Sequence, residues 1–219
     1  MNIALIVFAG SGSRISSSTP KQFIKIKNRD IVCYTIDAFE KHPLIDEIIL
    51  VTAVDFLCYV GELVSKEKYK KVKTIFPGGF SRQKSVKNGL DLSKYSDDDF
   101  ILIHDGDRPL VSEEIITNCI NELKEADGVA PIINHSEAIK EISNSGRYIE
   151  IEGKRFDIQT PQCFRYGLIK SAHELHKDEV VTDDISLIEN DYKVKYVDGD
   201  PLNFKITKDI DLEYFKRII

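Results

Sequence analysis

The stretch that decides the fold is residues 3–14, which read IALIVFAGSGSR. Its apolar run, rich in β-branched residues, is typical of a buried strand. Gly10 and Gly12 then allow the backbone to approach a ligand closely, and Arg14 and Lys21 place two cations beside that loop. This order of strand, glycine loop and cations predicts a phosphate-binding turn at the carboxyl end of a parallel sheet.

Taken alone, the Gly-x-Gly-x-Arg pattern is explained about as well by an ordinary turn between a strand and a helix. Its spacing does not complete the dinucleotide-binding fingerprint, and it lacks the Gly-Lys-Ser or Gly-Lys-Thr ending of a P-loop. The pattern therefore favours neither a nicotinamide enzyme nor a P-loop ATPase, and the remaining loops have to identify the ligand.

Composition and charge narrow the class of protein. The 219 residues suit one domain spanning 1–219, and a formal net charge of −6 disfavours a broad nucleic-acid-binding face. The four cysteines show no zinc spacing, and their apolar contexts predict buried free thiols in a reducing compartment. No apolar stretch is long enough to span a bilayer and no signal peptide is visible, so we expect a cytoplasmic protein that does not interact with a membrane.

Strands and helices alternate along most of the chain. After the first strand, the hydrophobic pattern predicts strands at residues 47–52, 72–76, 100–104, 128–133 and 192–197, and helices at 31–41, 55–66, 81–92, 112–126, 165–176, 183–189 and 210–218. Such alternation predicts an α/β fold with a mostly parallel sheet covered by helices on both faces.

Residues 134–158 break this alternation. Two short alternating segments, 138–142 and 148–151, flank Asn144-Ser145-Gly146, a pattern that predicts a β-hairpin leaving the main body. The segment is longer than a connection within the sheet requires. We therefore expect an arm that packs on another subunit.

Acidic residues follow the strand at residues 100–104. Asp105 is a poor core residue at a position where α/β sheets bind ligands, and a carboxylate near phosphates suggests Mg²⁺. Arg108 could neutralise charge that develops in a reaction. The alternative is an internal ion pair between Asp105 and Arg108. His104, at the end of a buried strand, is more consistent with a hydrogen-bonded core histidine than with a catalytic base.

Three further segments are ambiguous when each is taken alone. Gly78 and Gly79 precede a helix, where Ser81 or Ser85 could bond a base or a ribose, but a turn and a cap explain them too. Capping also explains residues 182–184. Lys205, in an apolar extended segment, is either a phosphate-binding lysine or a surface lysine whose stem covers apolar groups.

Considered together, these loops resemble the CTP-dependent cytidylyltransferases that act on sugar-alcohol phosphates. The resemblance covers residues 3–212, nearly the whole chain. It rests on residues 9–14 (AGSGSR), 20–23 (PKQF), Gly78-Gly79 with Ser81-Arg82 and Ser85-Val86, His104-Asp105 with Arg108-Pro109, 159–162 (QTPQ), Thr182-Asp183 and 203–207 (NFKIT). Each segment is weak alone, but their common order in one chain is a specific signal.

The resemblance implies a Rossmann-like fold of the nucleotide-diphospho-sugar transferase type and a role for each matched residue. Ala9, Gly10 and Gly12 would line the CTP phosphates, and Gly78, Gly79 and Ser85 would face the cytosine and ribose. Arg14 and Lys21 would hold the triphosphate, and Asp105 would bind Mg²⁺ near the substrate hydroxyls. Arg108, Thr160 and Lys205 would lie toward the acceptor phosphate. The hairpin would be the family's dimerisation arm, which makes a homodimer the expected assembly.

The chain departs from the family pattern mainly in the half that would bind the acceptor. Asp107 stands where a small or apolar residue is usual, and Ala138 stands in place of a threonine in the arm. Glu152 occupies the position of an arginine that grips the acceptor phosphate, so Lys154 or Arg155 would have to replace that cation.

These departures lead us to expect a polyol phosphate such as ribitol 5-phosphate as the acceptor, and a CDP-alditol for cell-surface polymers as the product. The alternatives are the methylerythritol phosphate acceptor of isoprenoid synthesis, a sugar-phosphate nucleotidyltransferase that uses another NTP, and a nucleotide-binding module without catalytic activity.

Overall fold

The computed structural model describes residues 1–10, 19–135, 140–142, 148–150, 153 and 155–219. The strands are β1 (Asn2–Phe8), β2 (Lys25–Ile26), β3 (Arg29–Asp30), β4 (Glu47–Thr52), β5 (Val72–Pro77), β6 (Phe100–Asp105), β7 (Gly128–Asn134), β8 (Lys140–Ile142), β9 (Tyr148–Glu150), β10 (Phe156–Ile158), β11 (Gln162–Arg165) and β12 (Val194–Asp198). The α-helices are α1 (Ile31–Lys41), α2 (Leu57–Glu67), α3 (Arg82–Leu92), α4 (Glu113–Glu122), α5 (Tyr166–Leu175) and α6 (Asp209–Ile218). Short 3₁₀ turns are η1 (Lys21–Phe23), η2 (Val54–Phe56), η3 (Leu123–Glu125) and η4 (Ile185–Leu187).

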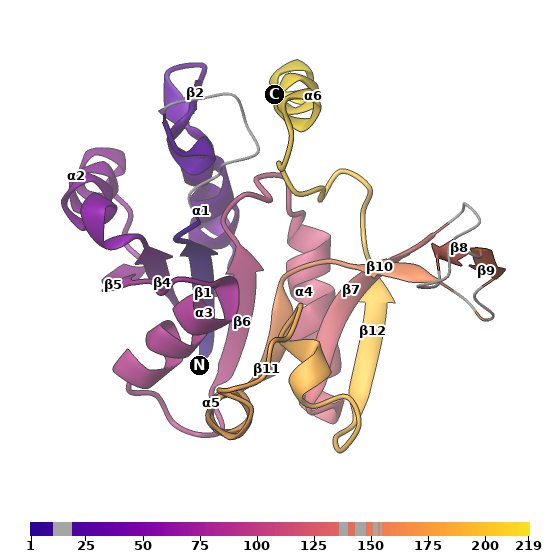
Figure 1. The fold of residues 1–219 in the computed structure, drawn as a ribbon. Coiled ribbons are helices and arrows are strands. Elements are labelled where there is room, and N and C mark those ends of the chain that lie inside the picture. Colours follow the sequence, from indigo (N-terminus) through magenta and orange to yellow (C-terminus); the bar gives the residue numbers. More distant parts are fainter. Residues whose placement is uncertain (11–18, 136–139, 143–147, 151–152, 154) are drawn as a thin grey trace.

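β1 lies inside the main sheet, between β4 and β6, and pairs in parallel with both (Figure 1). The sheet runs in the order β10-β7-β11-β6-β1-β4-β5, and β12 pairs in parallel with β7. Because β1, β4 and β6 run in parallel, the loops that follow them leave from the same edge of the sheet. This edge is where the sequence predicts the ligand.

The alternation of side chains along β1 divides the core between the two faces of the sheet. Ala4, Ile6 and Phe8 pack in a cluster with α1, α2 and α4, whereas Leu5 and Val7 pack in a second cluster with α3, α5 and η4. The chain therefore forms the predicted α/β structure, with helices on both faces of a mostly parallel sheet. A third, smaller cluster joins α6 to β2 and to the start of α1.

Most of the predicted helices and strands are confirmed, and their limits differ by a few residues. The helix predicted at residues 183–189 is wrong, because only the single turn η4 (Ile185–Leu187) forms there. Residues 162–165, where the sequence analysis predicted no strand, form β11, an antiparallel strand between β6 and β7. The strand predicted at residues 72–76 is confirmed as β5, which ends the sheet.

Of the described residues in the segment predicted to leave the main body, β8 and β9 do so, whereas Asn134 and β10 at its two ends pair in the main sheet. β8 and β9 pair with each other in a separate two-stranded sheet that projects from the side of the main sheet (Figure 1). The predicted turn at residues 144–146 and the position of Ala138 lie outside the described residues. Before and after the hairpin, Asn134 pairs with Phe156, so the two chain segments meet at its base.

Burial of the cysteines follows the prediction at three of four positions. Cys33, Cys119 and Cys163 are buried free thiols, but Cys58 lies exposed on α2. In the described part of the chain, none of the helices has the length and apolar character needed to span a membrane.

Candidate active site

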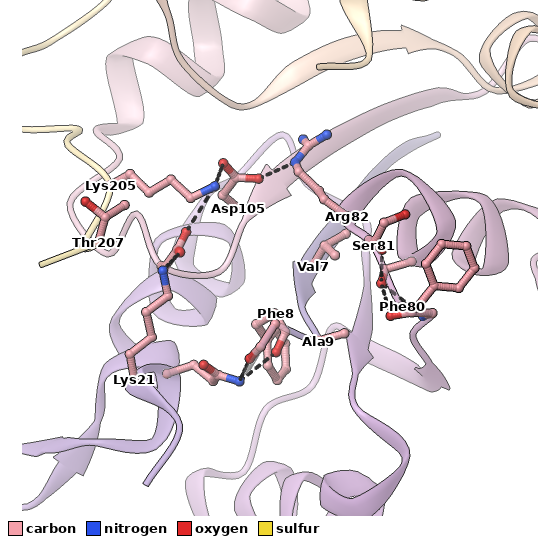
Figure 2. Close-up of a pocket in the computed structure, with 15 residues that line it drawn as sticks. Val7, Phe8, Ala9, Lys21, Phe80, Ser81, Arg82, Asp105, Lys205 and Thr207 are labelled. Carbon is pink, nitrogen blue, oxygen red and sulfur yellow. Dashed lines mark hydrogen bonds and ion pairs between the residues drawn. The ribbon is translucent and has the colours of Figure 1, made fainter. Parts of the chain in front are cut away.

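A cleft of about 470 Å³ opens at the carboxyl ends of β1, β5 and β6 (Figure 2). Its wall contains residues from five separate parts of the chain: Val7–Gly10, Lys21 and Gln22, Gly79–Arg82 with Ser85, Asp105 with Asp107, and Lys205 with Thr207. The fold thus brings together, in one cavity, most of the loops that the sequence analysis selected one by one.

The loop after β1 is held by Gln22. Its Nε2 donates hydrogen bonds to the carbonyl oxygens of Phe8 (2.9 Å) and Gly10 (3.0 Å), which fixes the backbone of Ala9 and Gly10 at the cleft wall. The sequence analysis quoted Gln22 but gave it no role. Gly12 and Arg14 lie outside the described residues, so their predicted contacts with phosphates stay predictions.

Lys21 extends into the cleft from η1. Its Nζ donates a hydrogen bond to the carbonyl oxygen of Ile206 (2.8 Å) and forms an ion pair with Asp107. Asp107 also lies 4.0 Å from Nζ of Lys205. The unusual carboxylate noted in the sequence therefore holds Lys21 in place between two loops.

Asp105 lines the cleft and forms ion pairs with three cations. Its Oδ1 accepts a hydrogen bond from Nε of Arg82 (2.7 Å), and its Oδ2 accepts one from Nζ of Lys205 (2.9 Å). Arg108 Nε lies 3.6 Å from Oδ2, so the predicted Asp105–Arg108 ion pair forms, although it is the longest of the three. Burial alone would raise the pKa of the Asp105 carboxyl, but these three cations hold it well below its usual range.

Arg82 connects Asp105 to a second buried carboxylate. Its Nη1 lies 2.8 Å from Oδ2 of Asp184, whose Oδ1 lies 3.0 Å from Nε2 of His173. Gln162 accepts hydrogen bonds from the backbone N–H groups of Asp184 and Ile185, which fixes the turn. The sequence analysis missed this chain of contacts, since it read residues 182–184 only as a cap.

His104 is a buried core histidine, as predicted. Its Nδ1 lies 3.0 Å from the hydroxyl of Thr160, and its Nε2 lies 3.1 Å from the carbonyl oxygen of Arg108. The same hydroxyl accepts a hydrogen bond from the Asp105 N–H (3.1 Å), so it donates its own proton to Nδ1. Burial lowers the pKa of His104 to about 4, so the ring is neutral and positions Thr160.

A second cavity of about 370 Å³ shares Arg82, Asp105 and Lys205 with the cleft. Its remaining wall is formed by Arg108, Phe156–Ile158, Thr160, Gln162, Thr182 and Asp183. The predicted acceptor-side residues Arg108, Thr160 and Lys205 are therefore brought together. Lys154 lies outside the described residues, and Arg155 is not among the described residues that line either cavity.

Among the described residues, the end of the cleft away from Asp105 and Lys21 carries no charged side chain of its own, and a closely packed glycine turn forms it. A Cβ on Gly78 would lie 2.3 Å from the Cβ of Ala9, so only glycine lets the loop after β5 approach the loop after β1. Ser85 Oγ accepts a hydrogen bond from the Gly79 N–H (3.0 Å) and donates one to the carbonyl oxygen of Ser81 (2.8 Å). Gly79 and Ser85 line the cleft, whereas Gly78 supports them from behind.

The oxygen donors of the cleft suit a hard divalent cation held by few protein groups. Asp105 and Asp107 both line it, and carboxylate oxygens keep lone pairs beyond those used by one hydrogen bond each. Within the described residues, no group of three or more His, Cys, Asp or Glu side chains could enclose a metal ion. The set therefore fits a cation that takes its other ligands from substrate phosphates and water.

Comparison with known proteins gives a consistent result. The family model described as "IspD: 2-C-methyl-D-erythritol 4-phosphate cytidylyltransferase" matches residues 2–219. The enzyme of that name from Clostridium botulinum (strain Okra / Type B1) is 41% identical, with 100% of this chain and 97% of the relative covered. That from Clostridium acetobutylicum is 42% identical, over 97% of this chain and 94% of the relative.

Solved structures agree with the sequence comparison. A 4-diphosphocytidyl-2C-methyl-D-erythritol synthase from Anaerococcus prevotii has a TM-score of 0.86 and 30% identity, over 99% of this chain and 95% of that one. Its counterpart from Francisella tularensis has a TM-score of 0.81 and 25% identity, over 100% and 99%. These similarities confirm the nucleotide-diphospho-sugar transferase fold and the CTP-dependent nucleotidyl transfer that the resemblance implied. The chain belongs to the IspD family of cytidylyltransferases.

Proposed function

We propose that this chain transfers the cytidylyl group of CTP to the phosphate of 2-C-methyl-D-erythritol 4-phosphate and releases pyrophosphate. The observation that carries the proposal is the pair of adjoining cavities that share Arg82, Asp105 and Lys205. The larger cleft suits the nucleotide, and the smaller cavity suits a small polyol phosphate.

The acceptor differs from the one that the sequence analysis preferred. We expected ribitol 5-phosphate because of departures at residues 107, 138 and 152. The relatives at 41% and 42% identity carry the name of the methylerythritol phosphate enzyme, which favours the alternative given there. Of the three departures, only Asp107 lies in the described cavities, where it pairs with Lys21 on the nucleotide side. It therefore gives no reason for a different acceptor.

The chemistry requires positioning and charge neutralisation. An oxygen of the acceptor phosphate attacks the α-phosphorus of CTP, and a new P–O bond forms while the bond to the β-phosphate oxygen breaks. Pyrophosphate leaves with that electron pair. The attacking phosphate is largely deprotonated at pH 7, because its second pKa is about 6. No general base is needed, which is consistent with a neutral His104 whose two ring nitrogens are already engaged.

Different cations of the site would bind the two substrates. Lys21 would stabilise the charge that moves onto the leaving pyrophosphate, together with Arg14. Lys205 lies on the wall between the cavities, where it can hold the two reacting phosphates together. Arg82 and Arg108 line the acceptor cavity, and each has a buried N–H group without a hydrogen-bond partner among the described residues. They are suited to an anionic acceptor.

A bound divalent cation, which we propose is Mg²⁺, would neutralise charge on the triphosphate. Asp105 would hold it, with Asp107 beside it. We also propose that the β8–β9 hairpin is a dimerisation arm, because it forms a small sheet of its own that leaves the main sheet.

The test is a product assay with CTP, Mg²⁺ and one acceptor at a time. The panel contains 2-C-methyl-D-erythritol 4-phosphate, D-erythritol 4-phosphate, which lacks the methyl branch, and ribitol 5-phosphate. We expect pyrophosphate release and a CDP-linked product with the first acceptor at the highest kcat/KM. A higher kcat/KM with ribitol 5-phosphate would overturn the proposal. Replacing CTP by UTP, GTP or ATP tests the nucleotide in the same assay.

A further inference from the structure

The two ends of the cleft differ in character. Lys21, Asp105 and Lys205 gather at one end, and Ala9, Ser81 and Phe80 lie at the other (Figure 2). Asp107 belongs to the charged end, because it pairs with Lys21. Under the proposed function, the charged end suits the triphosphate. A ligand that fills the whole cleft then needs a flat, less polar group at the opposite end, and a nucleobase is such a group.

Phe80 lies at that uncharged end with almost no protein contact. Its exposed fraction is 95%, although it is one of the residues that line the cleft. The chain has eleven phenylalanines, and the next most exposed is Phe156 at 39%, whose ring packs against Tyr196 at 5.3 Å. Leaving a large aromatic ring in water forgoes the stabilisation that burial gives other phenylalanines. A flat group bound at this end of the cleft would bury part of the ring and recover some of that stabilisation.

The backbone that carries Phe80 is fixed even though its side chain is not. Ser85 Oγ bonds both the N–H of Gly79 and the carbonyl oxygen of Ser81, the two neighbours of Phe80. Ser81 also caps α3 by accepting a hydrogen bond from the Lys84 N–H. The anchor is therefore held by hydrogen bonds, whereas the nearly fully exposed ring is free to rotate about its side-chain bonds at the edge of the cleft.

We propose that Phe80 is a base-stacking residue, whose ring closes over the pyrimidine ring of the bound nucleotide. The inference rests on the proposed function only in taking a nucleoside triphosphate as the ligand of the cleft. Stacking between an aromatic side chain and a base requires only two flat faces. Phe80 therefore contributes affinity, while selection among bases falls to the polar groups around Gly79, Ser81 and Ser85.

The first experiment compares CTP with tripolyphosphate, which presents three linked phosphates without a base. Loss of one stacking contact weakens binding by about tenfold. We expect Phe80→Ala to raise the Kd for CTP·Mg²⁺ by about tenfold and to leave the Kd for tripolyphosphate·Mg²⁺ unchanged. Phe80→Tyr should bind CTP like the wild type. Tyr192→Ala is the matched control, because Tyr192 is 47% exposed and precedes β12 at the opposite edge of the sheet.

The second experiment uses the fact that the chain contains no tryptophan. Phe80→Trp places a single indole at the proposed stacking position, and Tyr192→Trp places one away from it. We expect CTP·Mg²⁺ to quench the fluorescence of Phe80→Trp with the Kd found by calorimetry. Tripolyphosphate should not quench it, and Tyr192→Trp should respond to neither ligand.

Two results would overturn the inference. One is a Kd of Phe80→Ala for CTP within twofold of the wild type. The other is a Phe80→Trp emission that CTP leaves unchanged while calorimetry shows binding. Both experiments are binding measurements without an acceptor, so they succeed or fail independently of whether methylerythritol phosphate is the acceptor.

Discussion

Among the described residues, Lys21, Arg82 and Lys205 are the cations that line the cleft, and a carboxylate holds each of them in place. Lys21 shows this clearly, because Asp107 and the carbonyl oxygen of Ile206 hold it at the cleft wall. Such fixed donors stabilise developing charge without the cost of reorganisation at the moment of reaction. A lysine held in this way is more useful in catalysis than one that moves freely in solvent.

Lys21→Ala is expected to lower kcat by about 100-fold or more, the loss typical of removing one fixed donor to a developing negative charge. Steady-state assays with CTP and the acceptor measure it. Lys25→Ala, at an exposed position on β2, is the control and should retain wild-type kcat. An equal decrease in kcat in the two variants would show that Lys21 contributes only to the overall positive charge of this region and has no specific contact with the substrate.

His104 makes stability depend on pH. Burial lowers its native pKa to about 4 from an ordinary value of 6.5, so between these values the unfolded chain binds more protons than the native one. Stability therefore rises with pH across this window, is complete above about 6.5 and is lost as pH falls toward 4. The contribution is about 3 kcal/mol, since one pKa unit corresponds to about 1.4 kcal/mol.

Urea unfolding at pH 7 and pH 4.5 tests this expectation. His104→Gln should lose less stability than the wild type between the two pH values, because its side chain does not titrate. His176→Gln, on the loop after α5, should behave like the wild type. Below pH 4, protonation of Asp105 and Asp184, whose pKa values are lowered by ion pairs, removes further stability in all three proteins.

At the scale of elements, a series of ion pairs runs from Asp105 through Arg82 and Asp184 to His173. These contacts join β6, α3, η4 and α5. These contacts tie the loop of the active site to the helices on one face of the sheet. Asp184 is 1% exposed, so the pair it forms with Arg82 is screened little by water. Local order at the acceptor cavity thus depends on a carboxylate outside the reacting centre.

Asp184→Asn should destabilise the protein by about 3 kcal/mol, because breaking a buried ion pair leaves the partner charge uncompensated. The midpoint of urea denaturation measures it. Asp191→Asn, at an exposed position nearby, is the control and should change stability by less than about 0.5 kcal/mol. An Asp184→Asn variant as stable as that control would show that the contact contributes nothing to the fold.

At the scale of the whole molecule, the β8–β9 hairpin forms a two-stranded sheet of its own that projects from the side of the main sheet (Figure 1). Because Asn134 pairs with Phe156 at its base, a short Gly-Ser turn can replace residues 136–153 without lengthening the chain path. We expect light scattering to show a dimer for the wild type and a monomer for the shortened chain. A shortened chain that remains dimeric would exclude the hairpin as the dimerisation arm.

Features set by local pattern were predictable from sequence. The apolar run of β1 and the helical spacing of apolar residues in α1 are enough to predict a strand and a helix. The periodicity of each element then predicts which of its side chains are buried. The resemblance to the cytidylyltransferases assigned the glycine loops and Lys205 to one site, which agrees with the rule that strand ends in a parallel sheet meet at one edge. The cleft was therefore predictable even though no single motif identified it.

Features set by distant partners were not predictable. β11 has only four residues, and its strand structure comes from pairing with β6 and β7. Asp183 caps its turn as the local pattern indicates, by accepting a hydrogen bond from the Ser186 N–H. The next residue, Asp184, instead binds Arg82, 102 positions away in sequence. Local spacing carries no information about such a partner.

The wall that the two cavities share has a consequence for how the substrates affect each other. An anion in either cavity that attracts Lys205 weakens the hydrogen bond from Lys205 to Asp105. Both side chains also line the other cavity, so the second substrate then meets a changed distribution of charge. Thermodynamic linkage requires this effect to be reciprocal, so CTP must change the affinity for the acceptor by the same factor as the acceptor changes the affinity for CTP. The two substrates are therefore each other's effectors.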